Sequence, residues 1–350
     1  MYNLDVGPKL TPALIEDCRD SIRAGSKSFY AASLILPKDV RDAASALYAF
    51  CRLSDDMVDE RGATAQTVDR LRTRLTAVYR GYPFNYSADR ALAQVVSYYE
   101  IPEGVLMSML EGFEWDVSGR RYETFSDVLD YCARVAGTIG VMMTMIMQRR
   151  ARATLARASD LGTAMQLTNI ARDVGEDARN GRLYLPAQWL REEGIDPDAF
   201  LARPAFSPAI GRVVKRLLDE AGIIYKRSLT GLADLPHNCR PGIRTAGLVY
   251  AEIGAQVRRN GYDSITQRAY TSRAKKLSLL ARASVDTLWV PPRDDAAPLP
   301  ANDFLVQMSA KPVPEPVSAG EWFMDLMYTL KCRDHGIGLQ EERIQNLDPR

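Results

Sequence analysis

Apolar positions recur at intervals of three and four residues along most of the chain, from about residue 12 to residue 290. Val213, Leu217 and Ile224 form one such set. This spacing is that of one face of an α-helix, whereas the alternation expected of half-buried strands is scarce. Prolines that would separate successive helices stand at Pro37, Pro83, Pro102, Pro186, Pro197, Pro236 and Pro241. The pattern predicts an all-α domain of about ten helices.

The composition of the chain changes after Val290. The stretches PPRDDAAPLPANDF and KPVPEPV are rich in proline, which predicts a linker or a loose tail. Beyond them, residues 321–331 (EWFMDLMYTLK) have an amphipathic pattern. Such a segment either docks back on the main domain or lies on a membrane surface or a partner protein, and the sequence leaves both interpretations open.

The overall composition is that of an ordinary globular protein, with 350 residues, 46% of them hydrophobic, 25% charged, and a net charge of +1. A charge so close to zero gives no reason to expect a nucleic-acid partner. Five cysteines without a C-x-x-C pair and only two histidines argue against a zinc site or a disulfide framework. The N-terminus lacks the features of a signal peptide, and the longest apolar run, 135–147, is shorter than the roughly 20 residues that span a bilayer. We therefore expect a cytoplasmic protein.

The first candidate for chemistry is the acidic stretch LSDDMVDE at residues 53–60. On a helix Asp55 and Asp59 lie about 40° apart on one face, whereas Asp56 points about 100° away from Asp55. Two carboxylates one turn apart repel each other unless a cation lies between them. The stretch is therefore either a solvated acidic face or one side of a metal site in which Asp55 and Asp59 are the working pair.

A second acidic stripe follows in QLTNIARDVGEDARNGRLYLP, residues 166–186. Asn169, Asp173 and Asp177 are spaced by four residues, and Gln166 lies one turn before them. Oxygen ligands without histidine or cysteine suit Mg²⁺ or Mn²⁺, and Mg²⁺ commonly completes its shell with substrate phosphates. One such stripe alone is usually a solvated face. Two of them, each beside apolar residues, indicate a metal-dependent diphosphate clamp.

Basic and hydroxyl side chains near these stripes are candidates for phosphate contacts. Arg52 precedes Asp55 by three residues, and Arg172 and Arg182 flank the second stripe. The stretch GSKSFY places Ser26 and Ser28 at a predicted helix start, where backbone N–H groups favour an anion. An ordinary helix N-cap explains the same two serines equally well.

Four stretches together resemble the squalene/phytoene synthase family of head-to-head prenyl synthases: SFYAASLILP, LYAFCRLSDDMVDE, VAGTIG and QLTNIARDVGEDARNGRLYLP. The similarity runs over residues 14–290. The resemblance implies an all-α isoprenoid synthase fold, a single helical domain around a central apolar cavity. It divides the chain into an N-terminal extension (1–13), a catalytic domain (14–290) and a proline-rich C-terminal tail with a short amphipathic segment (291–350).

The resemblance also implies a reaction. It is strongest to bacterial members that make phytoene, prenyltransferases of carotenoid biosynthesis. These join two molecules of geranylgeranyl diphosphate through prephytoene diphosphate and release diphosphate, with Mg²⁺ and without NADPH. Because the substrates and product are lipids, we expect peripheral contact with the inner face of the cell membrane.

Three alternatives to this reaction stand beside it. Formation of squalene or dehydrosqualene from farnesyl diphosphate stays open, because one sequence does not show the depth of the cavity. Chain-elongating synthases and terpene cyclases carry different second motifs. Non-enzymatic relatives that act as assembly factors tend to lose the acidic ligands, which this chain keeps. The sequence leaves the number of subunits open.

Matching the family motifs position by position assigns the individual residues. Asp55 and Asp59 match the first pair of metal ligands, and the second stripe matches the other metal-binding set, Asn169, Asp173 and Asp177. Gln166 matches the polar residue before that set, and Ser26 and Ser28 match phosphate-facing serines. Positions implicated in diphosphate or substrate contact correspond to Tyr48, Arg52, Arg172, Tyr250, Arg268 and Lys276. The residues expected to act in catalysis are Tyr48, Arg52, Asp55, Asp59, Asp173 and Asp177.

The chain departs from the family pattern at two positions. Many relatives have a tyrosine two residues before VAG, where this chain has Ala133. Relatives often carry a histidine where this chain has Gly25. Neither change removes an expected metal ligand. Either Tyr131 or another group supplies what the missing tyrosine does, or that tyrosine is dispensable.

Overall fold

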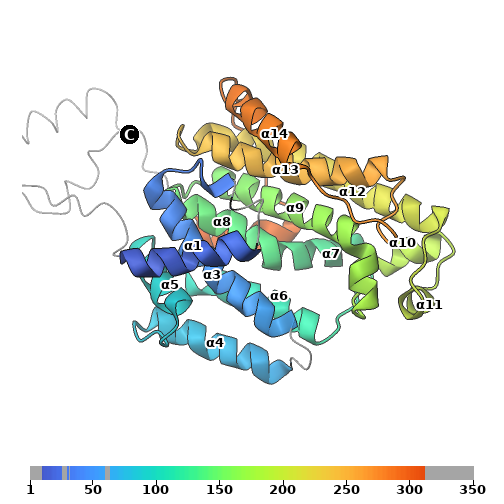
Figure 1. Ribbon diagram of the computed structural model, residues 1–350, viewed down its shortest axis with the longest axis horizontal. Helices are drawn as coiled ribbons and strands as arrows, with labels where there is room; N and C mark the ends of the chain where they lie inside the picture. The colour runs from blue at the N-terminus through green and yellow to red at the C-terminus, as the bar shows by residue number, and fades with distance from the viewer. Residues whose placement is uncertain (1–9, 26–29, 31, 60–63, 312–350) are drawn as a thin grey trace, which may run out of the picture. The chain divides into compact units, whose positions relative to one another are not determined.

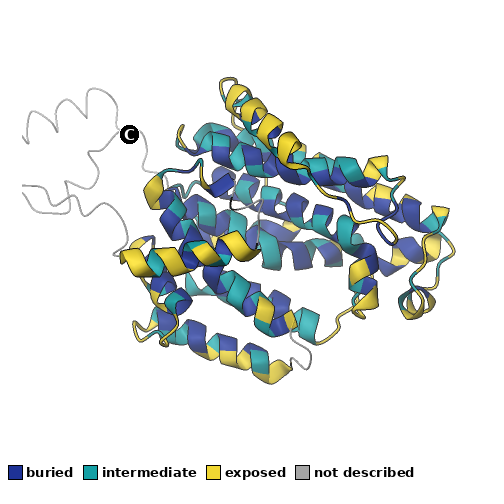
Figure 2. Cartoon of the chain, viewed as in Figure 1, coloured by how far each residue is buried: buried dark blue, intermediate teal, exposed yellow. Residues whose placement is uncertain are grey.

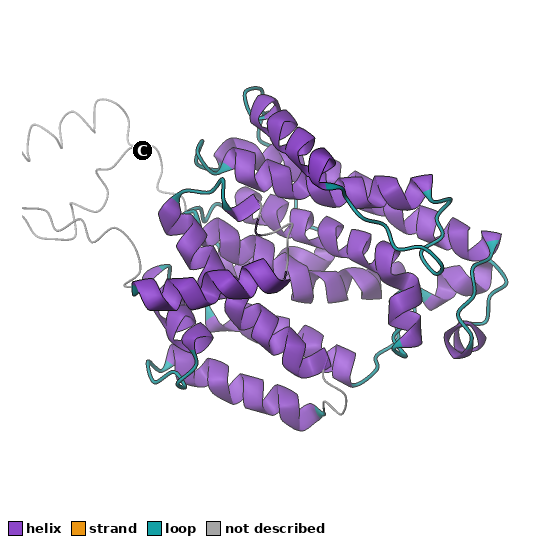
Figure 3. Cartoon of the chain, in the orientation of Figure 1, coloured by secondary structure: helices purple, strands orange, loops and turns teal. Residues whose placement is uncertain are grey.

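A computed structural model describes residues 10–25, 30, 32–59 and 64–311. Within these ranges every regular element is helical and no strand occurs (Figure 3), which confirms the predicted all-α class. The first half of the chain contains α1 (Pro12–Gly25), α3 (Lys38–Asp59), α4 (Ala65–Tyr79), α5 (Ser87–Tyr98), α6 (Glu103–Val117), α7 (Phe125–Cys132), the π-helix η1 (Ala133–Gly137) and α8 (Thr138–Ile146). The second half contains α9 (Arg152–Arg179), α10 (Ala187–Glu192), α11 (Pro197–Ala202), α12 (Pro208–Ser228), η2 (Leu229–Asp234), α13 (Arg240–Arg259), α14 (Arg273–Asp286), η3 (Pro300–Asn302) and α15 (Asp303–Ser309).

Prolines mark helix starts, as the sequence predicts. Pro102 and Pro186 are the N-cap residues of α6 and α10, and Pro197 is the first residue of α11. Proline suits these positions because the first N–H groups of a helix have no intrahelical partner. The structure has more helices than the ten expected, since short helices such as α10, α11 and α15 are too brief to produce a periodic pattern.

The 28-residue helix α9 lies at the centre of the fold (Figure 1). It packs against α8, α12, α13 and η1, and most of its residues are buried. One hydrophobic core joins α3 to α6 and α8, with Phe50 and Leu106 fully buried. The other core joins α9 to α12 and α13, with Leu167 and Val214 fully buried. Figure 2 shows the buried residues on the faces that the helices turn toward one another.

Two glycines let the backbone of α9 touch the preceding helical segment. A Cβ atom on Gly140 would overlap the carbonyl oxygen of Ala158, and one on Gly162 would overlap that of Ala136. Any side chain at these positions would push the helices apart. The close approach brings the apolar run 135–147 into the centre of the molecule.

The proline-rich chain after Val290 does not leave the helical body at once. Arg157, only 1% exposed, donates hydrogen bonds of 3.2 Å to the carbonyl oxygens of Ala296 and Ala297, and Asn302 donates to the buried Asp160 at 3.3 Å. A buried carboxylate and guanidinium need such partners. The compact unit accordingly ends at Ala310. The change of composition after Val290 therefore marks the start of a non-helical segment, residues 291–299, which we call the strap and which packs on the helical body. Residues 321–331 lie outside the described chain.

Candidate active site

The first acidic stripe occupies the last two turns of α3. Asp55 lines a cavity and receives a hydrogen bond of 3.2 Å from Arg52 Nη1. Burial, followed by repulsion from Asp59, raises the pKa of the Asp55 carboxyl to about 6. Asp56 is exposed and pairs with Arg52 on its own helix. The geometry therefore places Asp55 at the cavity and Asp56 beside it, as the helical spacing predicts.

The second stripe lies in the last three turns of α9. Asp173 pairs with Arg172, and Arg268 Nε lies 3.2 Å from Asp173 Oδ1. Burial, followed by repulsion from Asp173 and Glu176, raises the pKa of Asp177 to about 8. A carboxyl in such a place is held in its charged form only when a cation comes close.

Asn169 supplies the most direct sign of a missing partner. Its side-chain N–H₂ group donates to Gln166 Oε1 at 3.3 Å, but its Oδ1 atom is buried without any hydrogen bond. A buried amide oxygen without a donor is costly unless something else binds it. Among the described residues, no three acidic, histidine or cysteine side chains converge to hold a metal ion by themselves. The hard oxygen donors of the two stripes nevertheless fit Mg²⁺, which takes part of its shell from water and phosphate.

Arg182 joins the two stripes. It lies in the loop that follows α9, and its Nη1 atom is 2.7 Å from Asp59 Oδ1 at the end of α3. Its positive charge also lowers the pKa values of Asp55 and Asp177 against the effect of burial. One guanidinium acts on carboxylates of both helices, so the stripes face a common space.

A buried carboxylate that sequence reasoning missed lies in the same space. Asp116, near the end of α6, accepts hydrogen bonds from Tyr184 at 2.6 Å and Tyr131 at 2.9 Å. Burial raises its pKa to about 6, and Asp59 adds to this effect. The sequence did indicate that Asp116 lies on the buried face of its helix, because it follows the buried Met109 and Phe113 by seven and three residues.

The tyrosines around Asp116 bear on the departure from the family pattern at Ala133. Ala133 is fully buried in the core at the start of η1, whereas Tyr131 lines the cavity beside Asp116. The rings of Tyr131 and Tyr184 stack at 4.9 Å between centroids. Tyr131 is therefore the tyrosine of this segment that reaches the acidic site.

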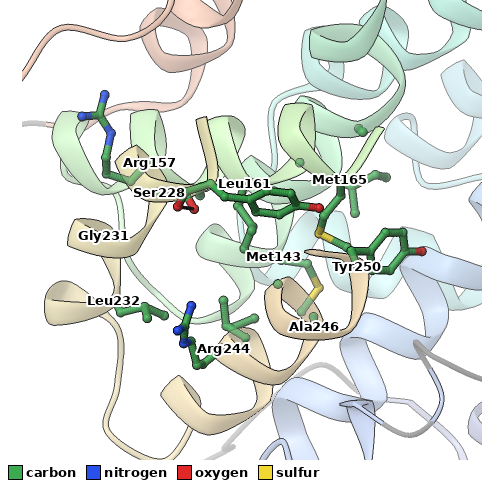
Figure 4. Close-up of a pocket in the computed structure, with 18 of the residues that line it drawn as sticks. Met143, Arg157, Leu161, Met165, Ser228, Gly231, Leu232, Arg244, Ala246 and Tyr250 are labelled. Atoms are coloured by element: carbon green, nitrogen blue, oxygen red, sulfur yellow. Dashed lines mark hydrogen bonds between the residues drawn. The ribbon is translucent and has the colours of Figure 1, made fainter. Parts of the chain in front are cut away.

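Two cavities extend from the acidic site between the helices. The first, 310 Å³, reaches the second stripe at Gln166 and Asn169 and continues between α8, α9, η2 and α13. Figure 4 shows Tyr250 and Met165 near one end of this cavity and Arg157, Gly231 and Leu232 near the other. The second, 340 Å³, reaches the first stripe at Asp55 and includes Asp116. The residues that line both cavities are Val135, Ile139, Met143, Gln166, Ile243 and Ala246.

The other expected site residues fall into four groups. Tyr48 and Arg52 line the second cavity and Tyr250 lines the first, whereas Arg172 and Arg268 contact the second stripe. Lys276 lies on α14 and lines neither cavity. Ser26 and Ser28 lie outside the described residues. In the described part of the chain, none of the helices combines the length and apolarity needed to cross a bilayer.

Comparison with known proteins agrees with this geometry. A sequence profile described as squalene/phytoene synthase matches residues 22–275, more than half of the chain. The chain belongs to the squalene/phytoene synthase family. This is a family of enzymes that use prenyl diphosphates, in general with a divalent metal.

Relatives within the squalene/phytoene synthase family match nearly the whole chain. The phytoene synthase of Rhodobacter capsulatus is 48% identical over 338 residues, which cover 94% of this chain and 99% of the relative. The phytoene synthase of Cereibacter sphaeroides is 46% identical over 346 residues, which cover 95% of this chain and 97% of the relative. Among solved structures, a dehydrosqualene synthase in complex with a ligand matches with a TM-score of 0.71 at 29% identity, covering 78% of this chain and 96% of that one. The predicted isoprenoid synthase fold is confirmed.

Proposed function

We propose that this protein is a phytoene synthase, a prenyltransferase that joins two molecules of geranylgeranyl diphosphate head to head and releases diphosphate. The observation that carries the proposal is the pair of cavities of similar volume that share one wall and reach the two acidic stripes. Two long apolar chains with anionic ends fit this arrangement. The names of the relatives that match nearly the whole chain favour the same product.

The acidic side chains would hold Mg²⁺, with Mn²⁺ as an alternative, and water and diphosphate oxygens would complete the metal shell. The proposed ligands are Asp55, Asp59, Asn169, Asp173 and Asp177. A bound divalent ion in this place supplies Lewis-acid stabilisation of the departing diphosphate. The free Oδ1 of Asn169 and the raised pKa values of Asp55 and Asp177 support this assignment, because each is a feature that a nearby cation would relieve.

The basic side chains of the site would orient the diphosphate groups. Arg52, Arg172 and Arg268 pair with carboxylates of the stripes in the structure, and Arg182 bridges the stripes. Guanidinium groups bind phosphate oxygens through two parallel hydrogen bonds, so these four are placed to hold two anionic ends. We include Ser26, Ser28, Tyr48, Gln166 and Tyr250 as further substrate contacts.

The apolar walls would protect the reaction from water. The first cavity is bounded by side chains such as Met143, Leu161 and Met165 along most of its length. An allylic cation formed at the acidic end would meet few nucleophiles there. Because the substrate and product are lipids, we also propose that the protein works in peripheral contact with a membrane. No NADPH is required for this product.

The test of the proposed function is a product analysis. Purified protein with Mg²⁺ is offered geranylgeranyl or farnesyl diphosphate, each with and without NADPH, and the lipid extract is analysed by chromatography and mass spectrometry. We expect a C40 hydrocarbon from geranylgeranyl diphosphate without NADPH. A C30 hydrocarbon as the sole product would instead establish the squalene or dehydrosqualene alternative and overturn the proposal.

A further inference from the structure

The outer face of α14 exposes an unusual amount of apolar surface. Leu277 is 67% exposed, and just beyond the helix Leu288 is 69% and Trp289 is 79% exposed. Leu277 lies on α14, whereas Leu288 and Trp289 directly follow its C-cap residue, Thr287. Val285 adds a further exposed apolar side chain. Together these four residues define the α14 patch.

Among the described helices, α14 packs mainly against α13. Its Leu279 and Ala283 pack with Leu248 and Val249 of α13 in a small core separate from the two large ones. An ion pair of 2.6 Å between Arg244 and Asp286 adds to this attachment. Figure 1 shows α14 as the outermost helix beyond α13, and Figure 2 shows its outer face exposed. Among the described residues, other parts of the chain cover only the inner face of α14. The α14 patch therefore lies on the side that is left uncovered.

Positive charge surrounds the α14 patch. Within α14 itself (Arg273–Asp286) the sequence holds four basic residues and one acidic residue, although the whole chain carries a net charge of only +1. Arg273, one turn before Leu277, is exposed, and Arg282 is exposed on the flank of the helix. Exposed leucine, valine and tryptophan bordered by arginine and lysine is the pattern of helices that lie in a lipid headgroup layer.

We infer that the α14 patch docks on the surface of a bilayer that contains anionic lipids. This inference identifies the surface that would make the proposed membrane contact. Its functional meaning rests on the proposed function, in which substrate and product are lipids. Leu248 lines the first cavity and also packs against Leu279 of α14, so docking would place this wall of the cavity one helix away from the bilayer. A lipid-soluble product would then be released beside a lipid phase instead of into water.

The charge of the patch argues for a lipid surface over a second copy of the chain. A symmetric dimer through α14 would place the same patch of each copy against its equivalent. The basic residues around one patch would then face those around the other, and like charges in contact oppose association. Anionic headgroups would instead complement them.

A vesicle sedimentation experiment with the full chain tests the inference. Vesicles of phosphatidylcholine with and without phosphatidylglycerol are mixed with the protein, and the bound fraction is measured at low and high salt. We expect binding to the anionic vesicles that weakens with salt, and a loss of at least tenfold in affinity for Leu277→Glu and for Trp289→Glu. The matched control is Ile223→Glu on α12, which changes an apolar side chain that is 56% exposed outside the patch and should bind like the wild type.

Three outcomes would overturn the inference. They are unchanged binding of both patch variants, equal loss in the Ile223→Glu control, and a wild-type dimer by light scattering that Leu277→Glu converts to monomer. Far-UV circular dichroism confirms that each variant is folded. Turnover of detergent-dispersed geranylgeranyl diphosphate should be the same for Leu277→Glu as for the wild type, so failure of the docking inference is distinguishable from failure of the proposed reaction.

Discussion

Asp55 and Asp56 are neighbours in the sequence with different surroundings in the structure. Asp55 lines the second cavity, where burial raises its pKa to about 6, whereas Asp56 is exposed and pairs with Arg52. Helical spacing alone separates the two carboxylates correctly, because one residue of a helix turns by about 100°. The sequence could not show that an arginine after α9 would reach Asp59 from the opposite side.

This difference gives a matched pair of variants. We expect Asp55→Asn to lower kcat roughly 1,000-fold, because it removes a charge at the proposed metal and diphosphate site. Asp56→Asn should stay within about threefold of the wild type, since its side chain is exposed and does not line the cavity. Steady-state kinetics with Mg²⁺ measure both effects. Equal losses in the two variants would contradict the assignment of Asp55 and Asp59 as the working pair.

The buried carboxyl of Asp116 should make the stability of the protein depend on pH. This carboxyl has a pKa of about 6 in the folded protein against an ordinary value of 3.8, so the folded protein holds this proton more tightly than the unfolded chain. Its contribution to stability is therefore complete below about pH 4 and is lost as the pH rises through 6. We expect the free energy of unfolding of the wild type minus that of Asp116→Asn to fall by about 2 kcal/mol between pH 4 and pH 7.

The measurement for Asp116 is urea denaturation of both proteins across this pH range without added divalent cation. The hydrogen bonds lost from Tyr131 and Tyr184 shift the difference by an amount that depends little on pH, so the slope isolates the titration of Asp116. A difference that stays constant with pH would show that the carboxyl is not held in its protonated form by burial.

At the scale of elements, the helical periodicity predicts the long helices well, but it says nothing of how closely they approach. Gly140 and Gly162 look alike in sequence to any glycine within a helix, such as Gly222 of α12. The structure separates them, because a Cβ on Gly162 would overlap the carbonyl oxygen of Ala136, whereas one on Gly222 would meet nothing within 4 Å. The π-helix η1, which begins two residues after Tyr131, was equally invisible to periodicity.

These two glycines make a matched test of packing. Gly162→Ala should lower the free energy of unfolding by about 2 kcal/mol or more, since the added methyl group forces α9 away from η1. Gly222→Ala should raise it by roughly 0.5–1 kcal/mol, because alanine favours the helix and fills open space. Chemical denaturation of both variants gives the comparison. Similar changes in both would mean that the contact between α9 and η1 is not tight.

At the scale of the whole molecule, the depth of the cavity decides which chain length fits. Leu161 lies on α9 two turns before Asn169 and lines the first cavity between the acidic end and the end at Leu232. Leu161→Trp would shorten the space available to a prenyl chain. We expect kcat/KM for geranylgeranyl diphosphate to fall about tenfold or more while that for farnesyl diphosphate changes much less.

Competition between the two substrates in one reaction mixture measures this preference directly. Farnesyl diphosphate serves as the internal control, since a general loss of activity would lower both values together. An equal fall for the two substrates would show that Leu161 does not limit chain length.

The sequence by itself determined the helical class, the positions of the long helices and the two acidic stripes, because each depends on a periodicity of three to four residues within one segment. It also led to the family, through motifs whose residues lie together along the chain. Only the tertiary structure decided which groups meet across segments: Arg182 with Asp59, Asp116 with Tyr131 and Tyr184, and the strap after Val290 with Arg157. Such contacts join residues far apart in sequence, and no local pattern specifies them, because they depend on how whole helices pack.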